Sequence, residues 1–71
     1  MTDQDFLARM KEILDNEAVT LDMSLADIEE LDSISLVSYV ALAKSACGKK
    51  IVPEQIQHCL TLRDLYALLG E

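Results

Sequence analysis

Apolar residues recur at helical spacing along most of this 71-residue chain, and no segment shows the strict alternation of a half-buried strand. The spacing predicts a helix over Asp3–Asn16, a second over Ser33–Cys47, a short third over Pro53–Cys59, and a last one between Thr61 and Gly70. A chain of this length has room for one domain. We therefore expect an all-α fold in one domain, residues 1–71. It is a small four-helix bundle of three longer helices and one short one, with a long first connection.

Capping residues stand at most of the expected helix ends. Thr2 or Asp3 can cap the first helix, and Thr61 followed by Asp64 has the form of a capping box for the last. Gly48 suits the left-handed residue that ends the second helix. These residues support the predicted boundaries.

The first connection, residues 17–32, contains neither proline nor glycine, so it is not a flexible linker. Ser24 followed by Asp27 also resembles a capping box, which predicts a helical turn near residues 25–29. The apolar residues that can hold the connection against the helices are Val19, Leu21, Leu25, Ile28 and Leu31. Long loops in small domains are often functional, which directs attention to its end.

The second helix carries apolar residues on more than one side. Its expected buried face consists of Leu36, Tyr39, Val40, Ala43 and Cys47. The other side consists of Val37, Ser38, Ala41, Lys44 and Ser45. Two interpretations stay open: the helix is covered on all sides, or Val37 and Ala41 belong to a surface that docks a partner.

The net charge of −7 argues against nucleic acid as a partner, because phosphates require a basic surface. Residues 1–33 carry ten acidic and two basic residues, whereas residues 34–71 carry three acidic and four basic ones. No apolar run is long enough to span a membrane. The acidic N-terminus is unlike a secretory signal. We expect a cytoplasmic, acidic protein whose partners present basic patches.

Residues for catalysis or metal binding do not gather in this sequence. Cys47 and Cys59 are too few and too far apart for a zinc site, which predicts two reduced, partly buried thiols. His58 has no acidic or cysteine neighbour at ligand spacing and is expected at the surface. The chain is therefore not expected to be an enzyme, and no metal is assigned to it.

Ser33 stands where the acidic connection ends and the second helix begins. A serine at this place is commonly a helix cap, but Asp32 can cap the helix itself. An attached phosphate diester at Ser33 would be stabilised by the helix N-terminus. Three interpretations remain: an attachment site, a plain helical interaction module with Ser33 as its cap, or a regulatory protein phosphorylated at Ser33.

The stretch Asp32-Ser33-Ile34 resembles the Asp-Ser-Leu signature of acyl and peptidyl carrier proteins. Ile51, 18 residues after the serine, and Pro53 resemble the Ile-Pro element of that family. Residues 24–28 and 60–69 resemble its lead-in and its final helix, so the likeness covers nearly the whole chain.

The resemblance implies that Ser33 receives 4′-phosphopantetheine, whose thiol carries an acyl or aminoacyl group as a thioester. It implies a free-standing monomer, modified by a phosphopantetheinyl transferase that uses coenzyme A and a divalent metal. Asp32 would assist that modification. The residues expected to dock partner enzymes are Glu29, Glu30, Ile34, Val37 and Ala41.

The sequence departs from the family pattern at two places, and these departures narrow the pathways that we expect the protein to serve. The glycine often found shortly before the serine is replaced by Glu29-Glu30-Leu31. The second helix also lacks the glutamates typical of fatty-acid carriers. We therefore expect a dedicated pathway of the fatty-acyl, polyketide or nonribosomal-peptide type, with its own ligase or synthase. An amino acid loaded by an adenylating ligase is the alternative cargo.

Overall fold

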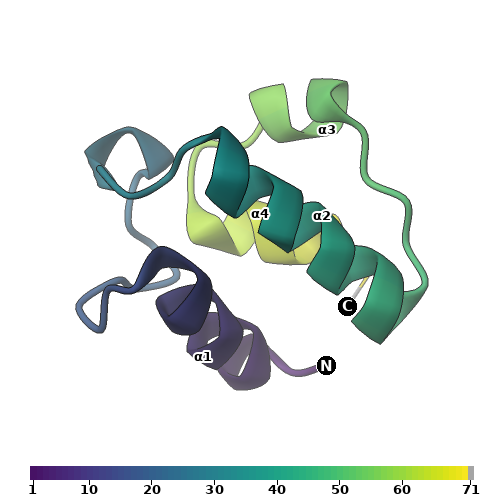
Figure 1. Cartoon of the computed structure of the whole chain (residues 1–71), viewed down its shortest axis with the longest axis horizontal. Helices are drawn as coiled ribbons and strands as arrows, with labels where there is room; N and C mark the ends of the chain where they lie inside the picture. The colour runs from purple at the N-terminus through teal and green to yellow at the C-terminus, as the bar shows by residue number, and fades with distance from the viewer. Residues whose placement is uncertain (71) are drawn as a thin grey trace.

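Four α-helices and one 3₁₀ turn form in the structure, a computed structural model that describes residues 1–70. The helices are α1 (Asp3–Leu14), α2 (Ser33–Cys47), α3 (Pro53–Gln57) and α4 (Leu62–Ala67), and the 3₁₀ turn covers Leu25–Asp27. Figure 1 shows α2 in the middle, with α4 behind it, α1 on one side and α3 across one end. Within the described residues the β-type pairing is one isolated bridge, between Ser24 and Thr61. The expected all-α fold with four helices is confirmed.

Side-chain caps hold both ends of the chain as the sequence predicts. Thr2 is the N-cap of α1, where its hydroxyl accepts a hydrogen bond from the Asp5 N–H. Thr61 and Asp64 form the predicted capping box of α4. Gly48 ends α2 in the left-handed region with φ +65°. A side chain there would be strained, so this position favours glycine.

Helix α1 is two residues shorter than predicted. It ends at Leu14 because Asp15 adopts a left-handed conformation, with φ 52° and ψ 45°. Aspartate tolerates this conformation better than most residues, and the Asp15 N–H still bonds back to the Glu12 carbonyl.

The later helices are also shorter than predicted. Helix α3 ends at Gln57 rather than Cys59, since the chain then turns so that the Leu60 carbonyl accepts from the Leu25 N–H at 2.9 Å. Helix α4 is six residues long and α3 is five, so the structure has two long helices and two short ones rather than the predicted three longer helices and one short one. The predicted turn near residues 25–29 is a three-residue 3₁₀ turn, capped by Ser24 through the Ala26 N–H rather than by a reciprocal box.

The buried face of α2 lies further round the helix than predicted. Its buried residues are Ser35, Tyr39, Leu42 and Ala43. The predicted Leu36, Val40 and Cys47 are only half-buried. The predicted face omits Ser35 and Leu42 because apolar residues occur nearly all round this helix, so their spacing does not mark one face.

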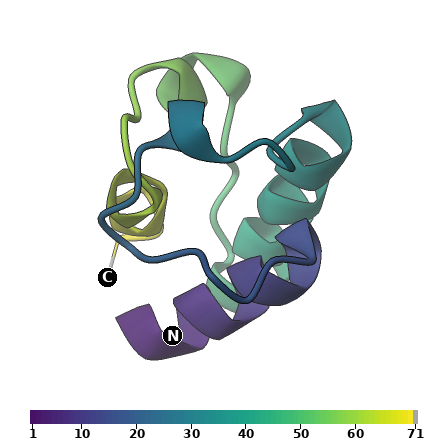
Figure 2. The same ribbon diagram turned by 90° about the vertical axis from the view of Figure 1, so that its left-hand side faces the viewer.

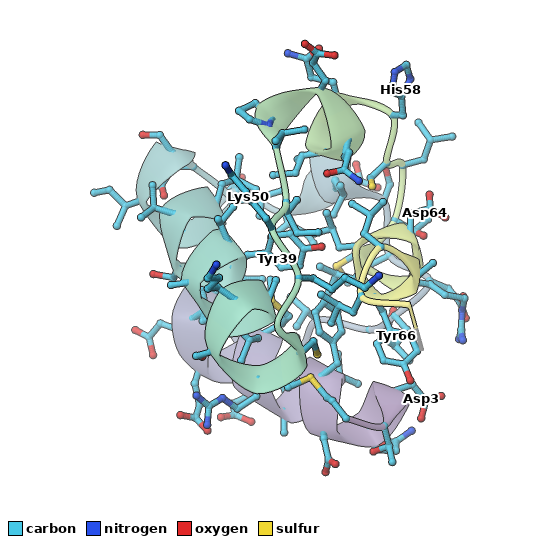
Figure 3. All side chains as sticks on the ribbon, turned by 90° about the vertical axis from the view of Figure 1, so that its right-hand side faces the viewer. Asp3, Tyr39, Lys50, His58, Asp64 and Tyr66 are labelled. Atoms are coloured by element: carbon cyan, nitrogen blue, oxygen red, sulfur yellow. The ribbon has the colours of Figure 1, made fainter. Side chains whose placement is uncertain are left out.

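Tyr39 lies at the centre of the molecule and connects α2 with α1 and α4 (Figure 3). Its side chain is fully buried, and its hydroxyl donates to the Leu65 carbonyl of α4 at 2.7 Å. Its ring meets Phe6 of α1 edge to face, with centroids 6.2 Å apart. Phe6 also contacts Tyr66 of α4 at 5.5 Å. Aromatic contacts and one buried hydrogen bond therefore connect three helices.

The connection between α1 and α2 is held to the α3–α4 side of the protein. Figure 2 shows it leaving α1, passing α4 and returning to the start of α2. Val19, Leu21 and Ile28 are buried in the core. The Arg63 N–H donates to the Leu21 carbonyl at 2.8 Å, and the Arg63 side chain pairs with Asp22 at 2.9 Å. The connection is therefore ordered without glycine or proline.

We predict that Tyr39→Phe lowers the free energy of unfolding by about 1–2 kcal/mol, because the Leu65 carbonyl loses a buried donor while the aromatic packing is kept. Chemical denaturation of the two proteins measures the difference. Tyr66→Phe is the matched control, since its hydroxyl bonds the Met1 carbonyl at 3.2 Å in a less buried place. A loss no larger for Tyr39→Phe than for Tyr66→Phe would contradict the central role of Tyr39.

Candidate functional site

Ser33 is the first residue of α2, and its side chain is exposed. The N-cap is Asp32, whose Oδ1 accepts a hydrogen bond from the Ser35 N–H at 2.9 Å. In return the Ser35 Oγ accepts from the Asp32 N–H at 2.8 Å. Within the described residues the Ser33 hydroxyl has no hydrogen-bond partner. The helix start is therefore capped without Ser33, whose hydroxyl is free to react.

The Asp32 carboxylate is stabilised in its charged form. The hydrogen bond from the Ser35 N–H lowers the pKa of Asp32 below its ordinary value of 3.8. The carboxylate also lies at the N-terminus of α2, where the helix dipole favours negative charge. Asp32 is thus ionised at neutral pH and lies next to the free hydroxyl in the chain.

The segment before Ser33 is tied at several points. The Leu31 N–H donates to the Ile28 carbonyl at 3.2 Å, and Ile28 is buried. The Asn16 side chain donates to the Glu30 carboxylate at 3.1 Å. The Ser35 hydroxyl lies 3.3 Å from the Glu30 carbonyl. The approach to Ser33 is therefore ordered although it lacks glycine.

The predicted docking residues lie close to Ser33 and are exposed. Ile34 is 76% exposed and Val37 is 69% exposed, which is unusual for such apolar side chains. Ala41, one turn further along α2 than Val37, is also exposed. These three residues follow one another at helical spacing and form an apolar strip beside Ser33.

The two predicted acidic docking residues differ in their surroundings. Glu29 is exposed and has no bonded partner within residues 1–70. Glu30 is exposed too, but its carboxylate accepts the bond from Asn16. The Glu29 carboxylate is therefore unbonded within residues 1–70, whereas the Glu30 carboxylate accepts a hydrogen bond from Asn16.

An apolar hollow of about 460 Å³ opens between α2 and α3, with Ser33 at its edge. It is lined by Ser33, Leu36, Val37, Val40, Ile51, Pro53, Ile56 and Gln57. No charged side chain lines it. Sequence reasoning missed this site because its residues come from two helices and the segment between them.

Sequence reasoning also missed Ser35, which is 5% exposed and holds the capping box. The pattern Asp-x-x-Ser at residues 32–35 carried a signal. A capping box normally has Glu or Gln at its fourth position, so a serine there is easily overlooked.

The cysteines, the histidine and the acidic side chains do not gather into a metal-binding group in the part of the chain that the structure describes. No group of three or more His, Cys, Asp or Glu residues is placed to hold a metal ion there. Cys47 and Cys59 are half-buried, and burial raises the pKa of the Cys59 thiol, with the charge of Asp64 adding to the effect. His58 projects into solvent, as Figure 3 shows.

No helix within residues 1–70 has the length and apolar character needed to cross a membrane.

The arrangement fits a phosphopantetheine arm attached at Ser33. The hydroxyl is exposed and unbonded, and the N-terminus of α2 favours the negative charge of a phosphate diester. The hollow next to it offers apolar walls to whatever the arm carries.

Known proteins resemble this chain over nearly its whole length. Residues 4–69 match a protein family described as "Phosphopantetheine attachment site". The chain is 32% identical over 75 residues to an acyl carrier protein of Renibacterium salmoninarum, covering 97% of this chain and 93% of that protein. It is 31% identical over 77 residues to an acyl carrier protein of Petrotoga mobilis, covering 100% of this chain and 91% of that protein. No solved structure matches significantly.

Proposed function

Because this chain belongs to the family of carrier proteins that hold 4′-phosphopantetheine covalently, we propose that Ser33 is the attachment residue. The observation that carries the proposal is the exposed Ser33 hydroxyl, left unbonded because Asp32 and Ser35 cap α2. When bound, the group supplies a terminal thiol that carries acyl groups as thioesters. The hydrogen bonds of α2 do not support the alternative in which Ser33 is only a helix cap.

Attachment is a transfer from coenzyme A, performed by a phosphopantetheinyl transferase. The Ser33 oxygen forms a bond to the phosphorus that carries the pantetheine. The P–O bond to the remaining nucleotide breaks, and adenosine 3′,5′-bisphosphate leaves. The hydroxyl proton passes to a base of the transferase. The ionised Asp32 next to Ser33 assists by keeping the helix start in place and by presenting a charge to that enzyme.

We expect Ser33→Ala to abolish the gain of a pantetheine arm when the protein is incubated with coenzyme A and a phosphopantetheinyl transferase. Intact mass measures the result. Ser38→Ala, one turn or more away on the same helix, is the matched control and should be modified as fully as the unaltered protein. An arm on Ser33→Ala would contradict the proposal. A single added phosphate on protein taken from cells would favour the regulatory alternative.

The cargo that the hollow favours is an apolar acyl chain. Its walls are mostly apolar, with Ser33 and Gln57 as the polar side chains, and no charged side chain among them can offset the ammonium group of an aminoacyl thioester. Each methylene that leaves water there contributes about 0.8 kcal/mol. We therefore propose that the protein serves a dedicated pathway of the fatty-acyl or polyketide type rather than one of the nonribosomal-peptide type.

Octanoyl-loaded protein should have a higher melting temperature than protein carrying the bare arm, because the chain buries methylenes between α2 and α3. Protein loaded with a glycyl group should have the same melting temperature as protein carrying the bare arm. Both are prepared by transfer from the corresponding coenzyme A thioesters and compared by calorimetry. Val40→Ser, which makes one wall polar, should reduce the octanoyl gain. Equal melting temperatures for the two cargoes would contradict the assignment.

Partner enzymes dock on the apolar strip formed by Ile34, Val37 and Ala41, and on Glu29. The strip supplies apolar contact next to the attachment site. Glu29 supplies a charge at its rim, which mainly accelerates encounter with a basic surface. Glu30 contributes to the same acidic field, and its bond from Asn16 keeps the segment ordered.

Glu29→Lys should slow loading by the cognate acyl-activating enzyme about tenfold at low salt, since the reversed charge repels a basic partner surface. Lys44→Glu, in the last turn of α2, should change the rate little. Glu30→Lys should slow loading and also lower the melting temperature, because it breaks the bond from Asn16. Equal effects of Glu29→Lys and Lys44→Glu in the loading assay would refute this docking surface.

A further inference from the structure

The Ser35 hydroxyl lies within hydrogen-bonding distance of three backbone groups in the segment before Ser33. Its Oγ accepts from the Asp32 N–H at 2.8 Å. The same oxygen lies 2.9 Å from the Asp32 carbonyl and 3.3 Å from the Glu30 carbonyl. One buried hydroxyl of α2 therefore contacts three backbone groups of residues 30–32.

The hydroxyl of Ser35 has one hydrogen, so it can donate to one of the two carbonyls at a time. The Asp32 carbonyl is the nearer, and it already accepts from the Leu36 N–H at 3.0 Å. The Glu30 carbonyl is the alternative acceptor. Since Ser35 is 5% exposed, water does not readily replace the hydroxyl. Its removal would leave backbone groups of residues 30–32 unpaired unless the segment moved.

The position of Ser33 follows from these contacts. Ser33 lies between Asp32, which Ser35 holds by its backbone, and the rest of α2, which the core holds through Tyr39. Asn16 adds a second tie at the Glu30 side chain. The backbone on both sides of Ser33 is thus fixed, although the Ser33 side chain itself makes no bond.

We propose that Ser35 is a positioning residue for the modification of Ser33. This inference depends on the proposed function, because it concerns the transfer of the arm to that hydroxyl. By fixing residues 30–32, Ser35 holds the Ser33 backbone, and with it the Cα–Cβ bond that carries the hydroxyl, at one place relative to the docked transferase. Small misplacements of a reacting atom are costly in rate, and a loose segment must be ordered during the reaction.

The test is the kinetics of transfer from coenzyme A to the apo protein by a purified phosphopantetheinyl transferase. Ser35→Ala should lower kcat about tenfold, equivalent to about 1.4 kcal/mol. KM for the apo protein should stay within about twofold, because the docking residues on α2 are unchanged. Assays are run well below the melting temperature of the variant, with its helical content checked by circular dichroism.

The matched control is Ser45→Ala, the same chemical change at the far end of α2, where the hydroxyl lies 3.5 Å from the Leu42 carbonyl. Its kcat should equal that of the unaltered protein. Ser35→Thr keeps the hydroxyl and should restore most of the rate. As a readout that needs no transferase, the Asp32 amide should exchange its hydrogen faster in Ser35→Ala than in the unaltered protein, while the Tyr39 amide does not.

The results separate three cases. A lower kcat with an unchanged KM and faster Asp32 exchange supports the positioning role. A lower melting temperature with kcat equal to that of Ser45→Ala, or a raised KM with kcat unchanged, overturns it, since Ser35 would then serve only stability or docking. If the unaltered protein gains no arm at all, the proposed function itself has failed.

Discussion

The arrangement around Ser33 depends on the reciprocal hydrogen bonds between Asp32 and Ser35 at the start of α2. The Asp32 carboxylate satisfies the Ser35 N–H, and the Ser35 hydroxyl satisfies the Asp32 N–H. A helix start needs such acceptors, because its first N–H groups have no partner within the helix. Since residues 32 and 35 fill this need, Ser33 between them keeps an unbonded hydroxyl. The cap thus fixes the backbone beside Ser33, the proposed attachment residue, and leaves its hydroxyl unbonded.

One side of α2 packs in the core, and another side faces solvent beside Ser33. Tyr39, Leu42 and Ala43 face the core, where Tyr39 connects α2 with α1 and α4. Ile34 and Val37 face solvent beside Ser33, where we propose that partners dock. Between these sides, Leu36 and Val40 line the hollow towards α3. One helix therefore anchors the fold, carries Ser33, the proposed attachment residue, and borders the hollow.

The helix N-caps and the end of α2 could be predicted from the sequence, because capping depends on local residue types. Thr2, Thr61 and Gly48 act as their residue types suggest. The buried face of α2 could not be predicted, since its apolar residues surround the helix and the choice of face is made by packing against α1 and α4. The hollow depends on how α3 lies against α2, which no short sequence pattern specifies. The early end of α1 depends on Asp15 adopting a left-handed conformation, which aspartate permits but does not require.

The most direct test of the account is to locate the arm on the unaltered protein. The protein is produced together with a phosphopantetheinyl transferase, digested, and sequenced by fragmentation mass spectrometry across residues 31–47. We predict that the added mass lies on Ser33, with Ser35 and Ser38 unmodified. An arm on Ser35 or Ser38, or a chain that stays unmodified in the presence of an active transferase, would contradict it.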